Sequence, residues 1–224
     1  MSGDPADFVR THTTLGRAPL TPEIALHLAT EITPIWHATE AWLSASNLSP
    51  PFWAFAWPGS QALARLLLDQ PALVAGRSVL DFASGSGLAA IAAARAGAAS
   101  VEAAEVDALA VAAIRLNAAA NGVVVTALDA DVVGRPCAWD VILAGDVCYE
   151  APMTGHILPW LRGLAAGGAT VLLADPGRAY LPNVGLTPVA TYDVPTTREL
   201  EDRTERRVVV YRLEQYQPDQ KRSG

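Results

Sequence analysis

The stretch Ser78-Val-Leu-Asp-Phe-Ala-Ser-Gly-Ser-Gly87 determines the predicted fold of this chain. It begins with a short apolar run that ends on the carboxylate of Asp81, and it continues into a loop that contains Gly85 and Gly87. The residues that follow, 88–96, are small and apolar. The segment is therefore expected to form a strand, a glycine-rich turn and a helix.

A second β-like run, Ser100-Val-Glu-Ala-Ala-Glu105, comes next, and Asp107 opens another helix. The two strands and the helix between them predict a βαβ unit. Glycines in its first turn let the backbone come close to a ligand, and the helix behind them offers unpaired N–H groups. This turn is therefore the first candidate for a binding site.

Two kinds of ligand fit such a turn, and Asp81 discriminates between them. The sequence Gly85-Ser-Gly-Leu-Ala-Ala90 matches the dinucleotide fingerprint, and Glu105 lies about 20 residues further on, where a ribose-binding acid belongs. A pyrophosphate on the turn would be repelled by the Asp81 carboxylate, whereas a ligand with an ammonium and a sulfonium group would be attracted. This favours S-adenosylmethionine over NAD as the cofactor.

The length and composition indicate one folded domain with a small N-terminal extension. Of the 224 residues, 51% are hydrophobic and 17% are charged, which is enough for a large core. No apolar run reaches membrane-spanning length, and residues 1–10 are too polar for a signal or transit peptide, so a cytoplasmic protein is expected. The two cysteines, Cys137 and Cys148, are too few for a disulfide framework, and both are expected to be buried thiols.

The charge balance and the histidines bear on the partners of the chain. A formal net charge of −7 and a sequence pI near 5.0 argue against a nucleic-acid-binding protein, which normally carries a basic face. No cluster of His or Cys has the spacing of a metal site, so no metal ion is expected.

The first 50 residues are expected to hold a polar tail and two helices. Residues 4–20 are polar and carry two prolines, and they indicate a tail that is either loose or ordered by contact with the rest of the chain. Thr21-Pro-Glu23 has the residue types of a helix start, and Thr33-Pro34 repeats it for a second helix that runs to about Ala45. The apolar positions of the first helix are Ile24, Leu26, Leu28 and Ile32.

Aromatic residues are concentrated in Pro51-Phe-Trp-Ala-Phe-Ala-Trp-Pro-Gly59. They are expected to pack the N-terminal helices onto the main domain, and Trp53 or Trp57 is expected also to wall a ligand pocket. Ser60 is expected to cap a helix that runs through about Asp69.

The rest of the chain alternates between predicted strands and helices. Strands are predicted at residues 78–80, 100–105, 123–128, 140–144, 169–174, 186–192 and 207–213, and helices at 88–96, 108–121 and 152–165. Pro159 is expected to kink or interrupt the last helix, and the charged segment 193–206 leaves no room for a helix between the last two strands. The predicted fold class is α/β: a Rossmann-like, seven-stranded, mostly parallel sheet with an antiparallel last strand, helices on both faces and an N-terminal helical extension.

Acidic residues end, or nearly end, each of the first five predicted strands. They are Asp81, Glu105, Asp129 or Asp131, Asp146 and Asp175. Because ligands of open α/β sheets bind outside the carboxyl ends of the strands, these acids are expected to line one edge of the sheet.

Each of these acids can be given a part in holding S-adenosylmethionine. Asp81 is expected to anchor its positive end through the glycine loop or a water, and Glu105 to accept from both ribose hydroxyl groups. Val106 would pack on the adenine, and Asp131 or Asp129 would accept from the adenine amino group. The other residues assigned to the cofactor site are Trp57, Ala83, Gly85, Gly87 and Asp146.

This pattern resembles the class I, seven-stranded S-adenosylmethionine-dependent methyltransferases. Asp146-Val-Cys-Tyr149 is similar to the Asp-x-x-Tyr element of the protein-lysine methyltransferase group within that class. Thr21-Pro-Glu-Ile-Ala-Leu-His-Leu28, the aromatic segment at 51–59 and Asp175-Pro-Gly-Arg178 together resemble the electron-transfer flavoprotein β-subunit lysine methyltransferase family, bacterial branch. The resemblance spans roughly residues 21–180, and it departs from the common pattern at Ala83, where many methyltransferases have glycine.

The resemblance implies a protein-lysine N-methyltransferase that acts on the flavoprotein β subunit, or alternatively on another protein such as a ribosomal protein. In that reaction Asp146 would orient the incoming lysine nitrogen, and Tyr149 would wall the channel or stack on the lysine. A monomer is expected, with an extension at 1–50, the methyltransferase domain at 51–216 and a tail at 217–224. The acceptor protein would contact the segment 193–206 and the N-terminal helices.

Three other functions stay open at this point. A methyltransferase of the same fold that acts on a small-molecule amine would need a lid over its pocket. An NAD-dependent oxidoreductase is disfavoured by Asp81, and a non-catalytic cofactor-binding adaptor is disfavoured by the presence of both Asp146 and Tyr149.

Overall fold

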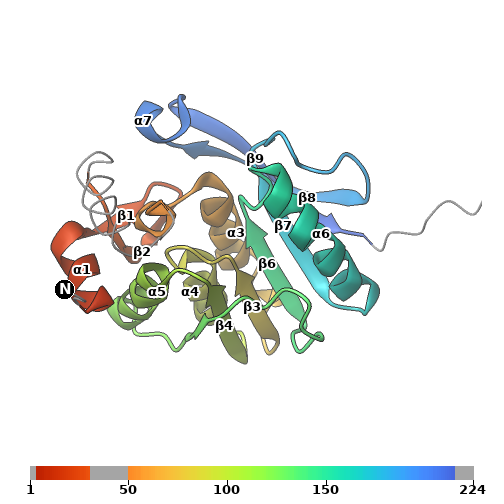
Figure 1. Cartoon of the computed structure of the whole chain (residues 1–224), viewed down its shortest axis with the longest axis horizontal. Helices are drawn as coiled ribbons and strands as arrows, with labels where there is room; N and C mark the ends of the chain where they lie inside the picture. The colour runs from red at the N-terminus through yellow and green to blue at the C-terminus, as the bar shows by residue number, and fades with distance from the viewer. Residues whose placement is uncertain (1–3, 31–49, 215–224) are drawn as a thin grey trace, which may run out of the picture.

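The structure is a computed structural model that describes residues 4–30 and 50–214. Its centre is one seven-stranded sheet with the order β5-β4-β3-β6-β7-β9-β8, in which β9 runs antiparallel to both of its neighbours and the other pairs are parallel (Figure 1). This confirms the predicted fold class. The strands are β3 (Ser78–Phe82), β4 (Ser100–Glu105), β5 (Thr126–Asp129), β6 (Val141–Gly145), β7 (Thr170–Asp175), β8 (Leu186–Pro195) and β9 (Glu205–Leu213).

Helices cover both faces of the sheet because the strand residues alternate between two buried cores. In β6, for example, Val141 and Leu143 belong to one core, and Ile142 and Ala144 belong to the other. The first core contains side chains of α3 and α4, whereas the second contains side chains of α6. The main helices are α3 (Pro58–Asp69), α4 (Leu88–Arg95), α5 (Ala108–Ala120) and α6 (Ala151–Ala166).

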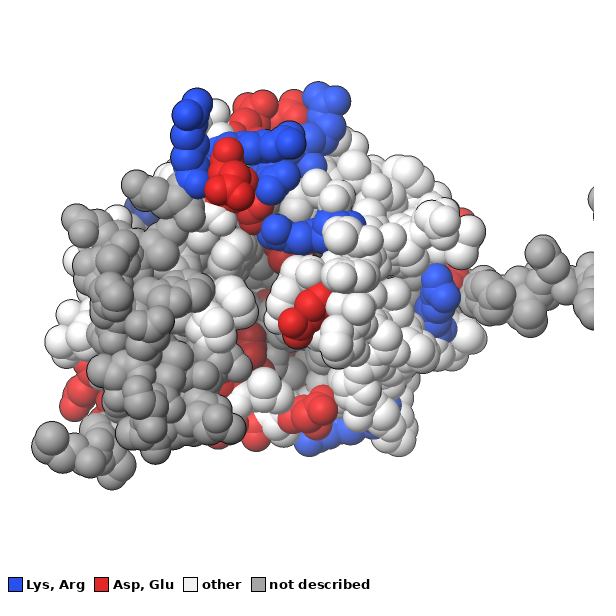
Figure 2. Space-filling model, turned by 45° about the horizontal axis from the view of Figure 1, so that its top comes forward, with Lys and Arg blue, Asp and Glu red and all other residues white. Residues whose placement is uncertain are grey.

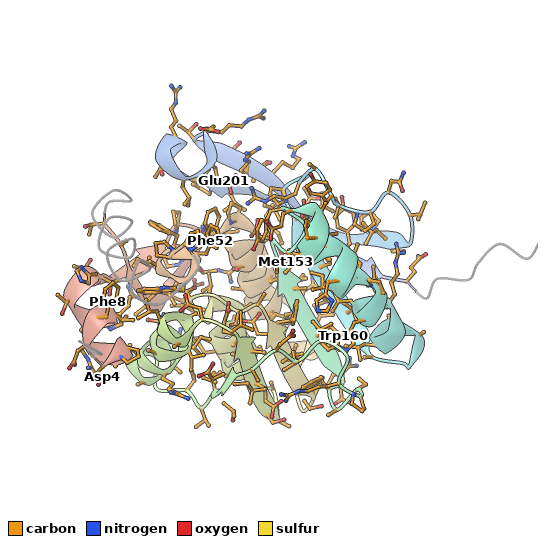
Figure 3. The ribbon with its side chains drawn as sticks, viewed as in Figure 1. Asp4, Phe8, Phe52, Met153, Trp160 and Glu201 are labelled. Carbon is orange, nitrogen blue, oxygen red and sulfur yellow. The ribbon has the colours of Figure 1, made fainter. Side chains whose placement is uncertain are left out.

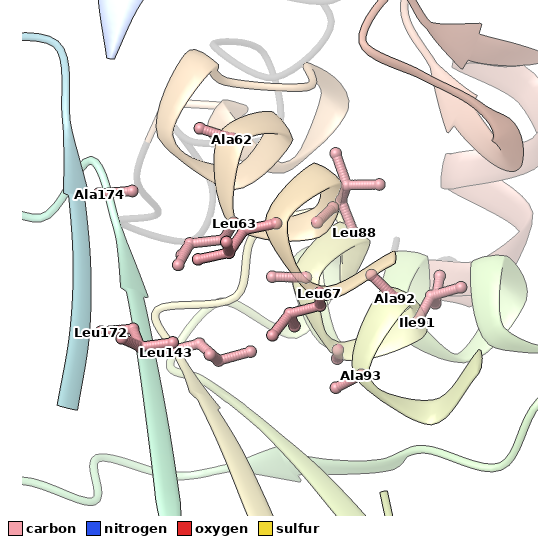
Figure 4. Packing of buried hydrophobic residues seen from close by; sticks show 14 of the residues in the cluster. Ala62, Leu63, Leu67, Leu88, Ile91, Ala92, Ala93, Leu143, Leu172 and Ala174 are labelled. Carbon is pink, nitrogen blue, oxygen red and sulfur yellow. The ribbon is translucent and has the colours of Figure 1, made fainter. Parts of the chain in front are cut away.

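The packing of α3 and α4 on the sheet fixes the glycine-rich turn. Leu63 and Leu67 of α3 and Ile91 of α4 are fully buried, and they pack with Leu143 and Leu172 of the central strands (Figure 4). Burying one such side chain contributes about 1.5–3 kcal/mol, so the helix behind the turn is firmly held.

The strand order reverses between β3 and β6. From β3 the chain goes outward to β4 and β5, and it then returns to β6 on the other side of β3. In open α/β sheets this reversal leaves a crevice at the carboxyl ends of the two strands, which is where a ligand is expected.

The N-terminal region differs from the prediction. Of the two alternatives for residues 4–20, the structure shows an ordered segment, which forms helix α1 (Pro5–His12) and strand β1 (Thr14–Ala18). The predicted helix from Thr21 is wrong, since strand β2 (Thr21–Leu28) pairs with β1 in an antiparallel hairpin. The second predicted helix, 33–45, lies outside the described residues.

Residues 21–28 form a strand because of their alternation and their neighbours. Ile24 and Leu26 are both fully buried and lie two residues apart, a spacing that suits a strand rather than a helix. The backbone N–H groups of Ala25 and His27 donate, at 3.0 and 2.7 Å, to the side-chain oxygens of Asn121, the C-cap of α5, and of Asn117 within it. Tertiary contact therefore overrode the helix-start signal.

Other details of the prediction also need correction. Helix α3 starts at Pro58 after Trp57 and not at Ser60, α6 continues through Pro159, and a one-turn helix, α7 (Arg198–Glu201), lies between β8 and β9. Helix α6 tolerates its proline because Ile157 and Leu161, on either side of it, are buried in the core. Cys148 is buried as predicted, but Cys137 is exposed, because it lies in the irregular segment before β6. Within residues 4–30 and 50–214, no helix combines the length and the apolar character that crossing a membrane requires.

Candidate active site

A pocket of ≈ 740 Å³ lies at the carboxyl ends of β3, β4 and β6, where the strand order reverses. Figure 2 shows a hollow on this face with acidic side chains at its border and arginine side chains gathered beside it. The aromatic segment, including the 3-10 turn η1 (Phe52–Ala54), covers one side, and the start of α6 covers the other. Lining residues include Phe52, Trp53, Phe55, Trp57, Ala83, Gly85, Glu105, Val106, Asp131, Asp146, Tyr149, Glu150, Met153, Arg178 and Leu200.

Asp81 lies beneath the glycine loop and does not line the pocket. One of its carboxylate oxygens accepts hydrogen bonds from Ser84 Oγ at 2.5 Å and from the N–H of Ala90 at 3.0 Å. Burial raises the pKa of this carboxyl to about 7, against the lowering effect of these two bonds. Asp81 therefore acts on the pocket through the loop that it holds.

The glycine loop has backbone angles that explain its sequence. Gly85 and Gly87 have φ angles of 57° and 81°, in the left-handed region that glycine adopts without strain. Ala83 has a φ angle of 51°, so alanine occupies a left-handed position where a glycine would be unstrained. Gly87 is not among the lining residues of the pocket: it packs against Ile114 of α5, which a Cβ at this position would approach to 3.3 Å.

Glu105 and Val106 lie at the end of β4 and line the pocket as predicted. The Glu105 carboxylate accepts from the N–H of Gly85 at 2.7 Å and from the N–H of Val106 at 3.2 Å. Burial raises its pKa despite these bonds. Each oxygen keeps a further lone pair for a ligand, and the Val106 side chain is exposed beside it.

The prediction left Asp129 and Asp131 open for the adenine contact. Only Asp131 lines the pocket, where its carboxylate accepts from the N–H of Val133 at 2.9 Å and lies 3.8 Å from Nε2 of His156. Asp129 is the last residue of β5 and is not part of the pocket wall. Asp175 is likewise absent from the wall, because one of its oxygens is used by the backbone N–H groups of Gly177 and Arg178.

Asp146 lies on the other side of the pocket, directly after β6, in a left-handed conformation with a φ angle of 57°. Its Oδ2 accepts from the N–H of Gly59 at 2.5 Å, and its Oδ1 accepts from Arg178 Nη2 at 2.9 Å. Burial raises the pKa of this carboxyl to about 6, and the Arg178 charge acts against that rise. At neutral pH Asp146 is therefore a carboxylate that can accept from a cationic or neutral amine.

Gly59 and Arg178 hold the Asp146 carboxylate, and the sequence reasoning missed both contacts. A Cβ on Gly59 would come within 2.8 Å of Ala174 O and of the Asp146 N–H, so this contact of α3 with β6 requires glycine. Arg178 was noted only as part of a motif. One signal in the sequence could have indicated Arg178: it follows β7 closely, and β7 is the neighbour of β6 in the sheet. The carboxyl ends of both strands, and hence Arg178 and Asp146, therefore meet at the same edge.

The pocket mouth carries a cluster of aromatic rings around Phe52. Its ring centroid lies 5.7 Å from that of Trp57 and 5.9 Å from that of Tyr149. Tyr149 lines the pocket and is 41% exposed, so it stands at the pocket rim. Phe52 of η1 and Met153 of α6 both line the pocket, and Figure 3 labels both side chains. Aromatic faces beside a carboxylate favour a cation with an apolar stem.

Comparisons with known proteins agree with this geometry. The family model "Ribosomal protein L11 methyltransferase" matches residues 62–146. Two solved methyltransferase structures have the same fold. A 16S rRNA methyltransferase of T. thermophilus has a TM-score of 0.55 at 20% identity and covers 91% of this chain and 50% of its own. A magnesium protoporphyrin IX methyltransferase of Synechocystis has a TM-score of 0.51 at 17% identity and covers 81% and 96%.

Curated relatives are more similar in sequence. The electron transfer flavoprotein beta subunit lysine methyltransferase of Rattus norvegicus is 41% identical over 163 residues, 71% of this chain and 62% of the relative. The Caenorhabditis elegans homolog is 30% identical over 190 residues, 77% of each chain. The Xenopus laevis relative is 38% identical over 206 residues, 88% of this chain and 82% of the relative. This confirms the resemblance predicted from the motifs: the chain belongs to the electron transfer flavoprotein beta subunit lysine methyltransferase family.

Proposed function

We propose that this chain transfers methyl groups from S-adenosylmethionine to lysine ε-amines, and that its acceptor is the β subunit of electron transfer flavoprotein. The observation that carries the proposal is the Asp146 carboxylate, which lines the pocket next to the aromatic rim. Membership of the family supports the acceptor, since the relatives bear that protein in their names.

The described residues fit S-adenosylmethionine. The pocket volume of ≈ 740 Å³ lies within the usual range of about 300–1,000 Å³ for small-molecule sites. On the β4 side, Glu105 offers two carboxylate oxygens for a ribose diol, and Val106 and Asp131 lie nearby for the adenine. The loop held by Asp81 presents Gly85 to the pocket.

S-adenosylmethionine supplies an electrophilic methyl group on a sulfonium, and the protein positions the amine that receives it. The aromatic rim holds the lysine stem, and Asp146 Oδ1 accepts a hydrogen bond from the lysine nitrogen. A lysine ammonium has a reference pKa of about 10.4. Removal from water and the positive charge of the sulfonium would lower this pKa, whereas the Asp146 carboxylate would raise it, and transfer requires the neutral amine, whose proton leaves to solvent. Because Gly59 and Arg178 already bind Asp146, its carboxylate keeps one orientation during these steps.

The test is transfer of isotopic label from S-adenosylmethionine to purified electron transfer flavoprotein. The wild-type chain should label the β subunit, and mass spectrometry should locate the label on lysine. Asp146→Asn should lower transfer by at least 10³-fold while cofactor affinity stays within about threefold, because the amide loses the charge that orients the amine. Label in small molecules instead of protein would support a small-amine methyltransferase, and near-normal transfer by Asp146→Asn would remove it from the site.

Several further properties belong to the same proposal. The chain acts as a monomer in the cytoplasm and does not bind nucleic acid, as the net charge of −7 supports. The catalytic domain is residues 51–216, preceded by an extension at 1–50 and followed by a tail at 217–224. The hairpin of β1 and β2, packed on α5, belongs to the extension.

A further inference from the structure

A chain of ion pairs leads away from Asp146 to helix α7. Arg178 Nη2 lies 2.9 Å from Asp146 Oδ1 and 2.6 Å from Glu201 Oε1. Arg178 Nη1 also donates to Glu201 Oε2 at 3.3 Å. The second oxygen of Glu201 accepts from Arg206 Nε at 2.9 Å. Two carboxylates and two guanidinium groups therefore alternate without a break.

Glu201 is unusual among the residues around it. Its side chain is 1% exposed, whereas Arg198, Asp202 and Arg203, its neighbours on the connection between β8 and β9, are exposed. In Figure 3, Glu201 lies on the side of α7 that faces Phe52 at the pocket mouth. Burial of a carboxylate costs free energy unless the group is paired. The ion pairs with Arg178 and Arg206 offset this cost for Glu201.

We propose that Glu201 is a positioning residue for Asp146 and acts through Arg178. Glu201 engages both terminal nitrogens of Arg178, and in this orientation Asp146 receives one hydrogen bond, from Nη2, while the buried Nε–H of Arg178 has no hydrogen-bond partner among the described residues. Without Glu201, the guanidinium is free to take both oxygens of Asp146 in the two-bond arrangement that arginine and carboxylate prefer. In that arrangement Arg178 would compete with the Gly59 N–H and with the incoming amine for the lone pairs of the two Asp146 oxygens.

Trp57 supports the same orientation. The Arg178 guanidinium carbon lies 5.9 Å from the centroid of the Trp57 ring, and Trp57 Nε1 donates to Phe52 O at 2.7 Å. Arg178 is thus held from the α7 side by Glu201 and from the pocket side by the tryptophan. Leu200, next to Glu201, lines the pocket itself, so α7 contacts the site at two successive residues.

The inference rests on the proposed role of Asp146, and its test compares Glu201→Gln with Glu205→Gln. Glu205 is the exposed first residue of β9 and serves as the matched control. Glu201→Gln should lower kcat roughly 10- to 100-fold, as expected for a small misplacement of a reacting group. The KM for the acceptor and the Kd for S-adenosylhomocysteine should stay within about twofold, and Glu205→Gln should match the wild type. An unchanged kcat, or a rise in acceptor KM alone, would overturn the positioning role.

A double-variant cycle tests whether the effect passes through Arg178. In an Arg178→Ala background, Glu201→Gln should produce no further loss of kcat, because its partner is already gone. Independent, multiplying losses would overturn the inference. If Glu201→Gln does not fold, Glu201→Asp keeps the buried charge but shortens the side chain, and the same fall in kcat is expected.

The orientation of Arg178 can also be measured without turnover, by NMR spectroscopy of the isotope-labelled protein. The guanidinium resonances of Arg178 in NMR spectra should be sharp in the wild type and in Glu205→Gln, and exchange-broadened in Glu201→Gln. Sharp Arg178 resonances in Glu201→Gln would contradict the inference. An active Asp146→Asn variant would instead overturn the proposed site, whereas an inactive Asp146→Asn beside a fully active Glu201→Gln would overturn the positioning role alone.

Discussion

The two sides of the pocket hold their carboxylates in different ways. On the cofactor side, Glu105 accepts from backbone N–H groups one and 20 residues away, and Asp81 from groups three and nine residues away. On the acceptor side, Asp146 accepts from Gly59, 87 residues away, and from Arg178, 32 residues away. The first side is built from local sequence, and the second is assembled by the tertiary fold.

This difference has a physical consequence. Backbone N–H groups of a short turn cannot move far without breaking the turn, so Glu105 and Asp81 are held by the geometry of one βαβ unit. The orientation of Asp146 depends on the docking of α3 and on a long arginine side chain, which is held in turn by Glu201. Remote substitutions should therefore damage the acceptor side more than the cofactor side.

Among substitutions of residues that hold the site in place, the largest effect is expected from Gly59→Ala. The added methyl group would meet Asp146 and Ala174, so α3 or the Asp146 carboxylate must shift. We expect kcat to fall about 100-fold and the free energy of unfolding to fall by about 1–3 kcal/mol, with cofactor affinity nearly unchanged. Steady-state kinetics and urea denaturation measure the two effects. Gly163→Ala in α6 is the control, because a Cβ at this position would meet no neighbouring heavy atom within 4 Å apart from adjacent residues and the backbone of its own helix. Equal losses in both variants would refute the local explanation.

Glu105→Ala should have the next largest effect, and on the other side of the pocket. The change removes an acceptor for the ribose diol and releases the N–H groups of Gly85 and Val106. One charge-assisted hydrogen bond contributes about 1.5–3 kcal/mol, so loss of the net value of one such bond should raise the Kd for S-adenosylhomocysteine roughly 10- to 100-fold. Calorimetric titration measures this, with Glu102→Ala on the same strand as control. If cofactor affinity is unchanged, Glu105 does not bind the ribose.

The same difference explains which parts of the site the sequence predicted. Asp81, Gly85 and Glu105 belong to one continuous pattern of strand, turn and strand, and the structure places Gly85 and Glu105 together in the pocket. The seven-stranded sheet was predictable for the same reason, because strand and helix alternate along the chain. The roles of Gly59, Arg178 and Glu201 were not predictable, since they depend on which strands are neighbours.

The N-terminal hairpin shows the second limit of sequence reasoning. Thr21-Pro-Glu23 has the residues of a helix start, but the segment pairs with β1 in a hairpin. Asn117 of α5 and Asn121, the residue that follows α5, accept from backbone N–H groups of β2, and Asn117 also donates to Ser86 O in the glycine loop. Hydrogen bonds from single asparagine side chains to the edge of a strand produce no periodic pattern of apolar residues, so the sequence does not reveal them.

Asp81 should make the stability of the cofactor side depend on pH. Its pKa is about 7 in the folded protein and 3.8 as the ordinary value, so between these values the folded state binds more protons than the unfolded state. The free energy of unfolding should therefore fall as the pH rises from about 4 to 7. Asp81→Asn should remove roughly 1–2 kcal/mol of this fall between pH 5 and 7, as measured by urea denaturation at each pH.

The control for this pH dependence is Asp140→Asn. Hydrogen bonds from Ser78 lower the pKa of Asp140, so this exposed carboxyl is ionised in both states above pH 5 and should leave the slope unchanged. An identical slope in wild type and Asp81→Asn would show that the burial of Asp81 does not raise its pKa in this way.

The smallest effect is expected from Ala83→Gly, and its sign distinguishes strain from chain entropy. Ala83 has a φ angle of 51°, and a left-handed alanine costs roughly 1–2 kcal/mol, whereas the extra freedom of glycine in the unfolded chain costs about 0.5–1 kcal/mol. Ala83→Gly should therefore raise the free energy of unfolding by up to about 1 kcal/mol without changing cofactor affinity.

The control is Ala119→Gly, at an exposed position of α5. It should lower the free energy of unfolding by about 1 kcal/mol, because no strain is relieved there. If both variants lose stability equally, Ala83 is not strained. A gain in stability with weaker cofactor binding would mean instead that the rigid alanine preorganises the loop, and that the cofactor side also depends on a costly conformation.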